Sequence, residues 1–245
     1  MRILAIETAT AQASVALLDG GAVVREAAAR VPQGHLEWLA PAIAGLLEAA
    51  AWGPEEVGAV AVSTGPGTFT GLRIGIATAA AWAYARGVPV VGVSTLEALA
   101  EGTASAMRAA GLVCPVLDAR RGEVAFALFD CRPQAARIVE DAVGPLPVLL
   151  ARIPAQRAVT FSGDGVPHIL EAIRVRPGWE AAPETLWYPR AAVTGSVALR
   201  RLARGERDEP HLLRPVYARA AGISPSRWTT GADAEQGTPR RSGED

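Results

Sequence analysis

Lysine is absent from the sequence, because every one of its 24 basic residues is an arginine. Without lysine the chain has no P-loop lysine, no Schiff-base amine and no lysine general base. The composition therefore excludes every mechanism that depends on a lysine side chain.

Cysteine and histidine are also scarce. The two cysteines, Cys114 and Cys131, form neither a disulfide framework nor a zinc pattern, and we expect both to be reduced and buried. His35, His168 and His211 lie far apart in the sequence and make no HxxxH or HExxH pair. We therefore expect no metal centre and no cofactor.

Charge and hydropathy set further limits. The formal net charge is −1, so the chain has no overall basic field that would attract nucleic acid or an anionic membrane. No uninterrupted apolar run reaches the roughly 20 residues of a membrane helix. The apolar N-terminal stretch is too brief for a signal peptide, and we expect a cytoplasmic protein.

What is present is a 245-residue chain that is 50% hydrophobic, which is enough for a large core. Its first 110 residues predict three antiparallel strands followed by alternating helices and strands. This order is typical of ribonuclease H-like folds. The expected elements are strands over 3–7, 13–19 and 22–28, a helix over 34–51, a strand over 57–62, a helix over 70–85, a strand over 88–93 and a helix over 94–108.

The second half repeats this order loosely, with fewer and shorter elements. We therefore expect an α/β protein of two lobes, with the first lobe spanning 1–110 and a smaller one 111–223. Residues 224–245 have no periodic apolar pattern, and we expect a disordered tail. The elements expected in the second half are strands over 112–118, 124–130, 138–141 and 159–162, and helices over 145–151, 166–173 and 191–205.

Two helices of the first half lack the polar face that a helix covering a sheet normally has. The helix over 34–51 carries only Glu37 and Glu48 as charged residues, and no charge lies between Arg73 and Arg86. A helix that is apolar on all sides is buried on all sides, which predicts a partner protein on the outer face. The alternative is that the two helices pack only on each other. The residues expected at the interface are Trp38, Ala42, Gly45, Gly71, Gly75, Ala79 and Trp82.

The glycine-rich turn between a strand and a helix, residues 65–71, lies where a phosphate-binding loop would lie. Pro66 removes one N–H from such a loop, and the strand over 88–93 does not end in an acid for a ribose. The turn also lacks the GK[ST] sequence of a P-loop. These departures weigh against a dinucleotide site.

Acidic and hydroxyl residues follow several expected strands. Glu7 ends the first strand, and Thr8 and Thr10 follow it, while Asp118 and Asp164 end strands of the second half. In actin-like ATPases such positions face phosphates or a metal. We therefore consider Thr8, Thr10, Asp118 and Asp164 a possible vestigial nucleotide site, with turn caps as the alternative.

Nucleophilic catalysis finds no support in the sequence. A serine-protease interpretation would have to combine Ser63 or Ser94 with His35 and an acid, but no nucleophile elbow is present. His35 is interpreted as a cap or a surface residue. We predict no catalytic residues.

The segment 63–75, STGPGTFTGLRIG, resembles the signature of the TsaB (YeaZ) family. Residues 3–10, 92–99, 117–124 and 162–165 also match that family, and 214–219 is similar to its terminal motif. Glu7 stands where many relatives carry aspartate. The signature residues carried over to this chain are Ser63, Thr64, Gly65, Pro66, Gly67, Thr70, Gly71 and Arg73.

The resemblance implies an ASKHA-type, actin-like fold of two ribonuclease H-like lobes. It also implies a role in making threonylcarbamoyladenosine at position 37 of tRNAs that read codons starting with adenine. In that family the protein is not the catalyst but a paralogue of the catalytic subunit TsaD, which carries a metal-binding HxxxH. The resemblance implies binding to TsaD through helices of the first lobe and association with the ATPase TsaE.

Two hypotheses follow. In the first, the chain is a non-catalytic scaffold that binds TsaD, or a second copy of itself when TsaD is absent, with indirect or weak tRNA contact and no membrane contact. In the second, it is an active ATPase or small-molecule kinase of the actin-like superfamily. Binding of ATP with magnesium separates them.

Overall fold

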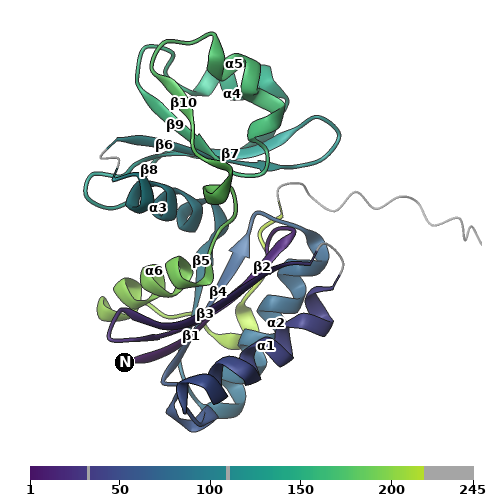
Figure 1. Ribbon diagram of the computed structural model, residues 1–245, viewed down its shortest axis with the longest axis vertical. Helices are drawn as coiled ribbons and strands as arrows, with labels where there is room; N and C mark the ends of the chain where they lie inside the picture. The colour runs from purple at the N-terminus through teal and green to yellow at the C-terminus, as the bar shows by residue number, and fades with distance from the viewer. Residues whose placement is uncertain (32–33, 109–110, 218–245) are drawn as a thin grey trace, which may run out of the picture.

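The structure is a computed structural model that describes residues 1–31, 34–108 and 111–217. Two five-stranded sheets, one from each half of the chain, form a lower and an upper lobe in Figure 1. The predicted α/β fold with two mixed sheets is confirmed. The tail predicted over 224–245 lies outside the described residues.

The first sheet has the strand order β3-β2-β1-β4-β5. The first three strands pair antiparallel, and β4 and β5 join them in parallel. The central strands β1 and β4 are almost entirely buried, because helices cover both faces of the sheet, and their sequences are accordingly continuous apolar runs. The strands are β1 (Arg2–Glu7), β2 (Gln12–Asp19), β3 (Ala22–Arg30), β4 (Ala59–Gly65) and β5 (Val90–Ser94).

Helices α1 (His35–Ala50) and α2 (Phe69–Arg86) cover the outer face of this sheet. Their inward residues, such as Leu39, Ile43 and Leu72, pack with the strands in one core. Figure 1 shows the two helices side by side on the lower lobe, away from the second sheet.

The second sheet has the order β10-β9-β6-β7-β8, which is the same order as the first when each half is numbered from its own start. The second half is therefore a fuller repeat than the sequence predicted. Strand β8 is longer than the predicted strand over 138–141, and β10 was not predicted. The elements are β6 (Leu112–Asp118), β7 (Val124–Asp130), β8 (Ala136–Gly144), α4 (Leu146–Arg152), β9 (Val159–Ser162), α5 (Leu170–Arg174) and β10 (Trp179–Ala181).

The last helix of each half packs on the sheet of the other half. Helix α3 (Thr95–Met107) follows β5 but shares a core with β6 and β7 of the second sheet. Helix α6 (Ala191–Ala203) follows β10 but packs on β1, β2 and β4 of the first sheet. Residues 191–203 thus lie with the first lobe, although the sequence prediction placed them in a lobe spanning 111–223.

Helices α3 and α6 lie between the two sheets (Figure 1). Ion pairs join these two helices. Arg200 of α6 lies 2.6 Å from Glu101 of α3, and Arg201 lies 2.5 Å from Glu97. Arg201 also donates to the carbonyl oxygen of Gly92 at 2.7 Å. Arg200 and Arg201 of α6 therefore link the two lobes.

The remaining short helices are 3-10 turns, and both cysteines are buried and free, as predicted. Burial raises the pKa of the Cys131 thiol to about 12, which keeps it protonated and unreactive. None of the helices in the described part of the chain is long and apolar enough to cross a membrane. The 3-10 turns are Pro54–Glu56, Val166–Ile169, Glu184–Leu186 and Pro210–Leu212.

Candidate functional site

The hydroxyl residues after β1 point into the protein. Thr8 is 0% exposed, and its Oγ1 donates to the carbonyl oxygen of Gly71 in α2 at 2.8 Å. Thr10 is 3% exposed, and its Oγ1 donates to the carbonyl oxygen of Gln12 at 3.1 Å. The Nε2 atom of His35 lies 2.9 Å from the carbonyl oxygen of Thr10, so His35 is a buried anchor of this turn rather than a surface residue.

Glu7 at the end of β1 is completely buried. Its Oε1 accepts hydrogen bonds from Ser63 Oγ at 2.7 Å and from the backbone N–H of Ala9 at 2.9 Å. Thr194 Oγ1 of α6 lies 3.4 Å from Oε2. Burial raises the pKa of Glu7 to about 7, although these hydrogen bonds act in the opposite direction. The group joins β1, β4 and α6 and is closed to solvent.

The two acids of the second half accept hydrogen bonds from backbone N–H groups of the second half rather than from Thr8 or Thr10. Asp164 Oδ1 accepts the N–H of Asp118 at 3.0 Å, and Asp118 Oδ1 accepts the N–H of Arg120 at 2.7 Å. Burial raises the pKa of Asp164. Among the described residues no hydrogen bond links these acids to the threonines of the first half. Each pair fits the turn-capping alternative, and the vestigial nucleotide site stays a prediction.

The glycines of the signature allow α2 to lie against the turn between β1 and β2. The N–H of Thr68 donates to the carbonyl oxygen of Ala9 at 2.7 Å. A β-carbon at Gly67 would lie 2.5 Å from that same oxygen, and one at Gly71 would overlap the carbonyl oxygen of Thr8. One at Gly75 would overlap Thr8 Oγ1. The glycine spacing thus serves a contact within the chain.

Three of the seven residues predicted at the interface are buried inside the protein. Gly71 and Gly75 are buried, and Ala79 is 0% exposed, because this stripe of α2 faces its own sheet. Trp38, Ala42 and Trp82 are half-buried and pack at the edge of the first core. Gly45 alone of the seven residues faces open space, since a β-carbon there would meet no atom within 4 Å.

The rest of the signature divides between the core and the surface. Ser63 Oγ donates to Glu7 Oε1, and Thr64 Oγ1 donates to the carbonyl oxygen of Val93 at 3.3 Å. Gly65 and Pro66 are buried in the turn, while Thr70 and Arg73 are exposed on α2. The two exposed residues mark the face of α2 that is opposite the glycines.

The outward faces of α1 and α2 are exposed and poor in charge. On α2 this face has one cation, Arg73, among small and aromatic residues, and α1 adds Glu37 and Glu48. The sequence analysis named none of its apolar residues except Gly45. Their i, i+3, i+4 spacing on α2, from 70 to 84, is the signal that could have found them. The exposed apolar and small residues are Leu36, Ala40, Pro41, Ala44, Gly45 and Ala49 on α1, and Phe69, Thr70, Ala77, Ala81, Tyr84 and Ala85 on α2.

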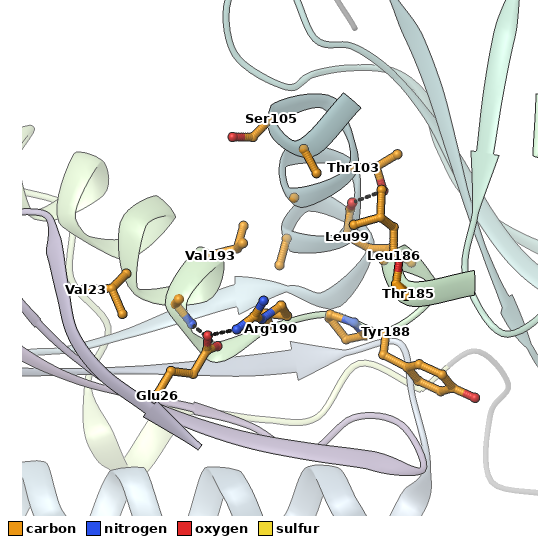
Figure 2. A pocket seen from close by; sticks show the side chains of 15 residues that line it. Val23, Glu26, Leu99, Thr103, Ser105, Thr185, Leu186, Tyr188, Arg190 and Val193 are labelled. Atoms are coloured by element: carbon orange, nitrogen blue, oxygen red, sulfur yellow. Dashed lines mark hydrogen bonds and ion pairs between the residues drawn. The ribbon is translucent and has the colours of Figure 1, made fainter. Parts of the chain in front are cut away.

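A cavity of about 410 Å³ lies beside helices α3 and α6. Figure 2 shows the side chains that line it. Leu99 and Thr103 of α3 face Val193 of α6 across it. Glu26 of β3 pairs with Arg190 at its floor and accepts the N–H of Ala192 at 3.1 Å. These polar groups already have partners in the protein. Within residues 1–31, 34–108 and 111–217 no group of three or more His, Cys, Asp or Glu is placed to hold a metal ion.

Two sheets of order 3-2-1-4-5 with exchanged helices define a two-lobed protein of the actin-like, ASKHA architecture. The C. difficile activator of 2-hydroxyisocaproyl-CoA dehydratase, solved with bound ADPNP, has this fold at a TM-score of 0.50 and 11% identity, covering 85% of this chain and 99% of its own. Residues 3–174 match the family described as TsaD, tRNA N6-adenosine threonylcarbamoyltransferase.

The chain belongs to the TsaB (YeaZ) family. It is 32% identical over 231 residues to the tRNA threonylcarbamoyladenosine biosynthesis protein TsaB of Escherichia coli, covering 89% of this chain and 95% of that protein. The TsaB of Bacillus subtilis is 36% identical over 129 residues, or 53% of this chain and 55% of that protein. A solved YeaZ of Pseudomonas aeruginosa matches with a TM-score of 0.76 and 31% identity, covering 88% of this chain and 99% of its own. The resemblance identified in the sequence is confirmed.

Proposed function

We propose that this chain is a non-catalytic subunit of the machinery that makes threonylcarbamoyladenosine in tRNA, and that α1 and α2 bind TsaD. The relatives named TsaB in E. coli and B. subtilis, both described as biosynthesis proteins for this nucleoside, support the process. The TsaD partner is supported by the match of residues 3–174 to the TsaD family itself.

The observation that carries the proposal is the outward face of α1 and α2. This face contains three charged side chains within its two long helices, namely Glu37, Glu48 and Arg73, apart from Arg86 at the end of α2. Leu36 is 67% exposed, Phe69 48% and Tyr84 84%. Exposed apolar side chains on neighbouring helices are typical of a protein-binding surface.

TsaD is the proposed partner because its sequence is related to that of this chain. The chain is 36% identical over 113 residues to the tRNA N6-adenosine threonylcarbamoyltransferase of Pelobacter propionicus, covering 40% of this chain and 33% of that protein. Two related chains with equivalent helices can pair as two copies of one chain do, across a pseudo-twofold axis. The same face would pair two copies of this chain when TsaD is absent.

A non-catalytic role is supported by the closed end of the first sheet. Glu7 and Thr8 are 0% exposed, and Thr10 is 3% exposed, so these side chains offer nothing to a phosphate group. We propose that catalysis belongs to TsaD, that TsaE joins the complex of the two chains, and that tRNA contacts this chain weakly or indirectly.

The direct test mixes the purified chain with TsaD and measures complex formation by size-exclusion chromatography and titration calorimetry. Ala77→Glu and Ala44→Glu place charges on the outward faces of α2 and α1 and should abolish co-elution. Val175→Glu is the matched control, because Val175 is 73% exposed but lies in the second half. Co-elution of Ala77→Glu with unchanged affinity would place the interface elsewhere.

A second measurement addresses catalysis. Titration of the isolated chain with ATP and magnesium should give no binding heat and no phosphate release. Tight binding with turnover would instead establish the ATPase hypothesis. Restoring the modified nucleoside in a TsaB-depleted bacterium, scored by mass spectrometry of its tRNA, tests the process itself.

A further inference from the structure

The C-terminal part of the described chain crosses the first lobe to reach the glycine-rich turn over 65–71, which we call the signature turn. The N–H of Asp208 donates to the carbonyl oxygen of Val90 at 2.9 Å, and Asp208 Oδ2 accepts the N–H of Gly92 at 2.7 Å. Leu213 is 8% exposed and belongs to the core beneath α2. The segment 208–217 therefore runs from the edge strand β5 to the N-terminus of α2.

At the signature turn the fit between the two segments is close. The N–H of Val216 donates to the carbonyl oxygen of Thr64 at 2.7 Å. Gly65 has a φ of +118°, and a β-carbon there would overlap the carbonyl oxygen of Val216. The turn leaves room for the C-terminal segment only because residue 65 is a glycine.

Beyond this contact, Phe69, Arg73 and Tyr217 form a cluster, which we call the aromatic clamp. The rings of Phe69 and Tyr217 stack with centroids 5.2 Å apart and an interplanar angle of 23°. The Cζ atom of Arg73 lies 3.7 Å from the Phe69 centroid, and its Nε donates to Tyr217 Oη at 2.9 Å. The arginine is thus fixed by a cation–π contact and a hydrogen bond.

The aromatic clamp fixes the position of Arg73 but leaves part of its guanidinium available for a further contact. Its Nε is used, but its Nη1 and Nη2 make no ion pair or hydrogen bond with the residues that the structure describes. Arg73 is exposed, and it lies on the outward face of α2 in line with Ala77 and Ala81. A guanidinium with both Nη atoms free is suited to a carboxylate.

We propose that the aromatic clamp is the N-terminal end of the TsaD-binding surface, where Arg73, positioned by Tyr217, donates hydrogen bonds to a carboxylate of TsaD. This inference rests on the proposed function and adds the C-terminal segment to it. Arg73 is the one charged side chain of α2 before its last residue, beside Phe69 and Val216, which are 48% and 51% exposed. Nearby Arg214 donates to the carbonyl oxygens of His211 and Leu213. This arrangement fits a protein surface better than RNA. An RNA backbone needs a series of cations, and the next charged residue of α2 is Arg86 at its end.

The test measures the affinity of the full chain for TsaD by titration calorimetry. Arg73→Gln should weaken binding about tenfold or more and reduce its salt dependence, because the charge pair is lost. Tyr217→Ala should weaken binding to a similar degree, and Tyr217→Phe, which keeps the stack, by roughly threefold. The double variant Arg73→Gln/Tyr217→Phe should bind like Arg73→Gln alone, because Tyr217 acts through Arg73.

The controls separate this inference from the proposed function. Val175→Ser removes an exposed apolar side chain from the second half and should leave affinity unchanged. If wild type and Tyr217→Ala bind TsaD equally while Ala77→Glu does not bind, the clamp is outside the interface and the inference is wrong. If wild type itself fails to bind TsaD, the proposed function fails first. If Arg73→Gln weakens only tRNA binding by the assembled complex, the clamp contacts RNA, which also overturns the inference.

Discussion

The two halves of the chain build sheets of the same strand order but cover them with helices of different length. Outside the first sheet α1 has 16 residues and α2 has 18, whereas outside the second sheet α4 has 7 and α5 has 5. The outer face of α5 carries an exposed ion pair, Glu171–Arg174, while the outward faces of α1 and α2 are mostly uncharged. The sheet is a repeated framework, and the outer helices are the part in which the halves have diverged.

The ends of the first strands differ as well. Glu7 at the end of β1 is fully buried among Ser63, Ala9 and Thr194. Asp118 at the end of β6 is partly exposed and pairs with Arg120 at 3.3 Å. An acid at the same place in two repeated halves thus has a buried role in one and a turn-capping role in the other. Four predictions test how far the halves differ, beginning with the largest expected effect.

The largest effect is expected from filling the glycine contact that fixes α2. Gly71→Val should destabilise the protein by about 3 kcal/mol or more, because the new side chain overlaps the carbonyl oxygen of Thr8. Thr70→Val, on the exposed neighbouring position, is the matched control and should change stability by less than about 1 kcal/mol. Urea unfolding followed by tryptophan fluorescence measures both. Equal losses would mean that α2 is not held by this contact.

Glu7 should make the stability of the first half depend on pH. Burial raises its pKa from 4.5 to about 7, so the folded state binds this proton more tightly than the unfolded chain does. The stability that the bound proton contributes is complete below about pH 4.5 and is lost as the pH rises through about 7. Glu7→Gln should therefore be more stable than wild type by about 2–3 kcal/mol at pH 8, and similar to it at pH 4.5.

The glutamine fits the same hydrogen bonds. Its Oε1 can accept from Ser63 and Ala9, and its Nε2 can donate to Thr194 Oγ1, which also lies 3.4 Å from the carbonyl oxygen of Arg190. Urea titrations at several pH values measure the difference. Ser63→Ala should increase the loss at pH 8, because it removes a donor to the charged form. A pH-independent difference between Glu7→Gln and wild type would contradict the buried carboxyl.

The third prediction compares glycines at corresponding strands. Gly65 at the end of β4 and Gly163 after β9 have φ values of +118° and +120°. At Gly163 a β-carbon would overlap the carbonyl oxygen of Val116 inside the second sheet, whereas at Gly65 it would overlap that of Val216 in the C-terminal segment. Gly163→Ala should cost about 2–3 kcal/mol and Gly65→Ala about 1 kcal/mol, because the segment can move away.

Hydrogen exchange of the Val216 amide distinguishes the two variants. Its protection by the carbonyl oxygen of Thr64 should be lost in Gly65→Ala and kept in Gly163→Ala. Loss of protection in both variants would show that the two halves respond as one unit at this position.

The smallest effect concerns Gly45 on α1. Gly45→Ala should stabilise the protein by up to about 1 kcal/mol, because the helix gains propensity and the new methyl group meets no atom. The same variant should weaken TsaD binding, because the close approach of a facing helix is blocked. Thermal unfolding and titration calorimetry measure the two effects. Higher stability with unchanged affinity would exclude Gly45 from the interface.

The sequence by itself determined the class of fold and the family. Apolar runs and turn residues placed every strand of the described residues except β10, and most of the helices, because burial and local turn geometry act over short stretches of chain. The charge-poor character of the helices over 34–51 and 70–85 was also readable from composition. The motif over 63–75 identified the family because this combination of residues is specific to the TsaB (YeaZ) signature.

Only the tertiary structure decided which way each helix faces and which sheet it covers. Gly71, Gly75 and Ala79 form a small-residue stripe that fits either a partner or the chain's own turn, and the closeness of Thr8 to α2 favours the turn. The exchange of α3 and α6 between the lobes, and the contact of Tyr217 with Arg73, join residues far apart in sequence. No local pattern records such contacts, because they depend on how distant segments pack.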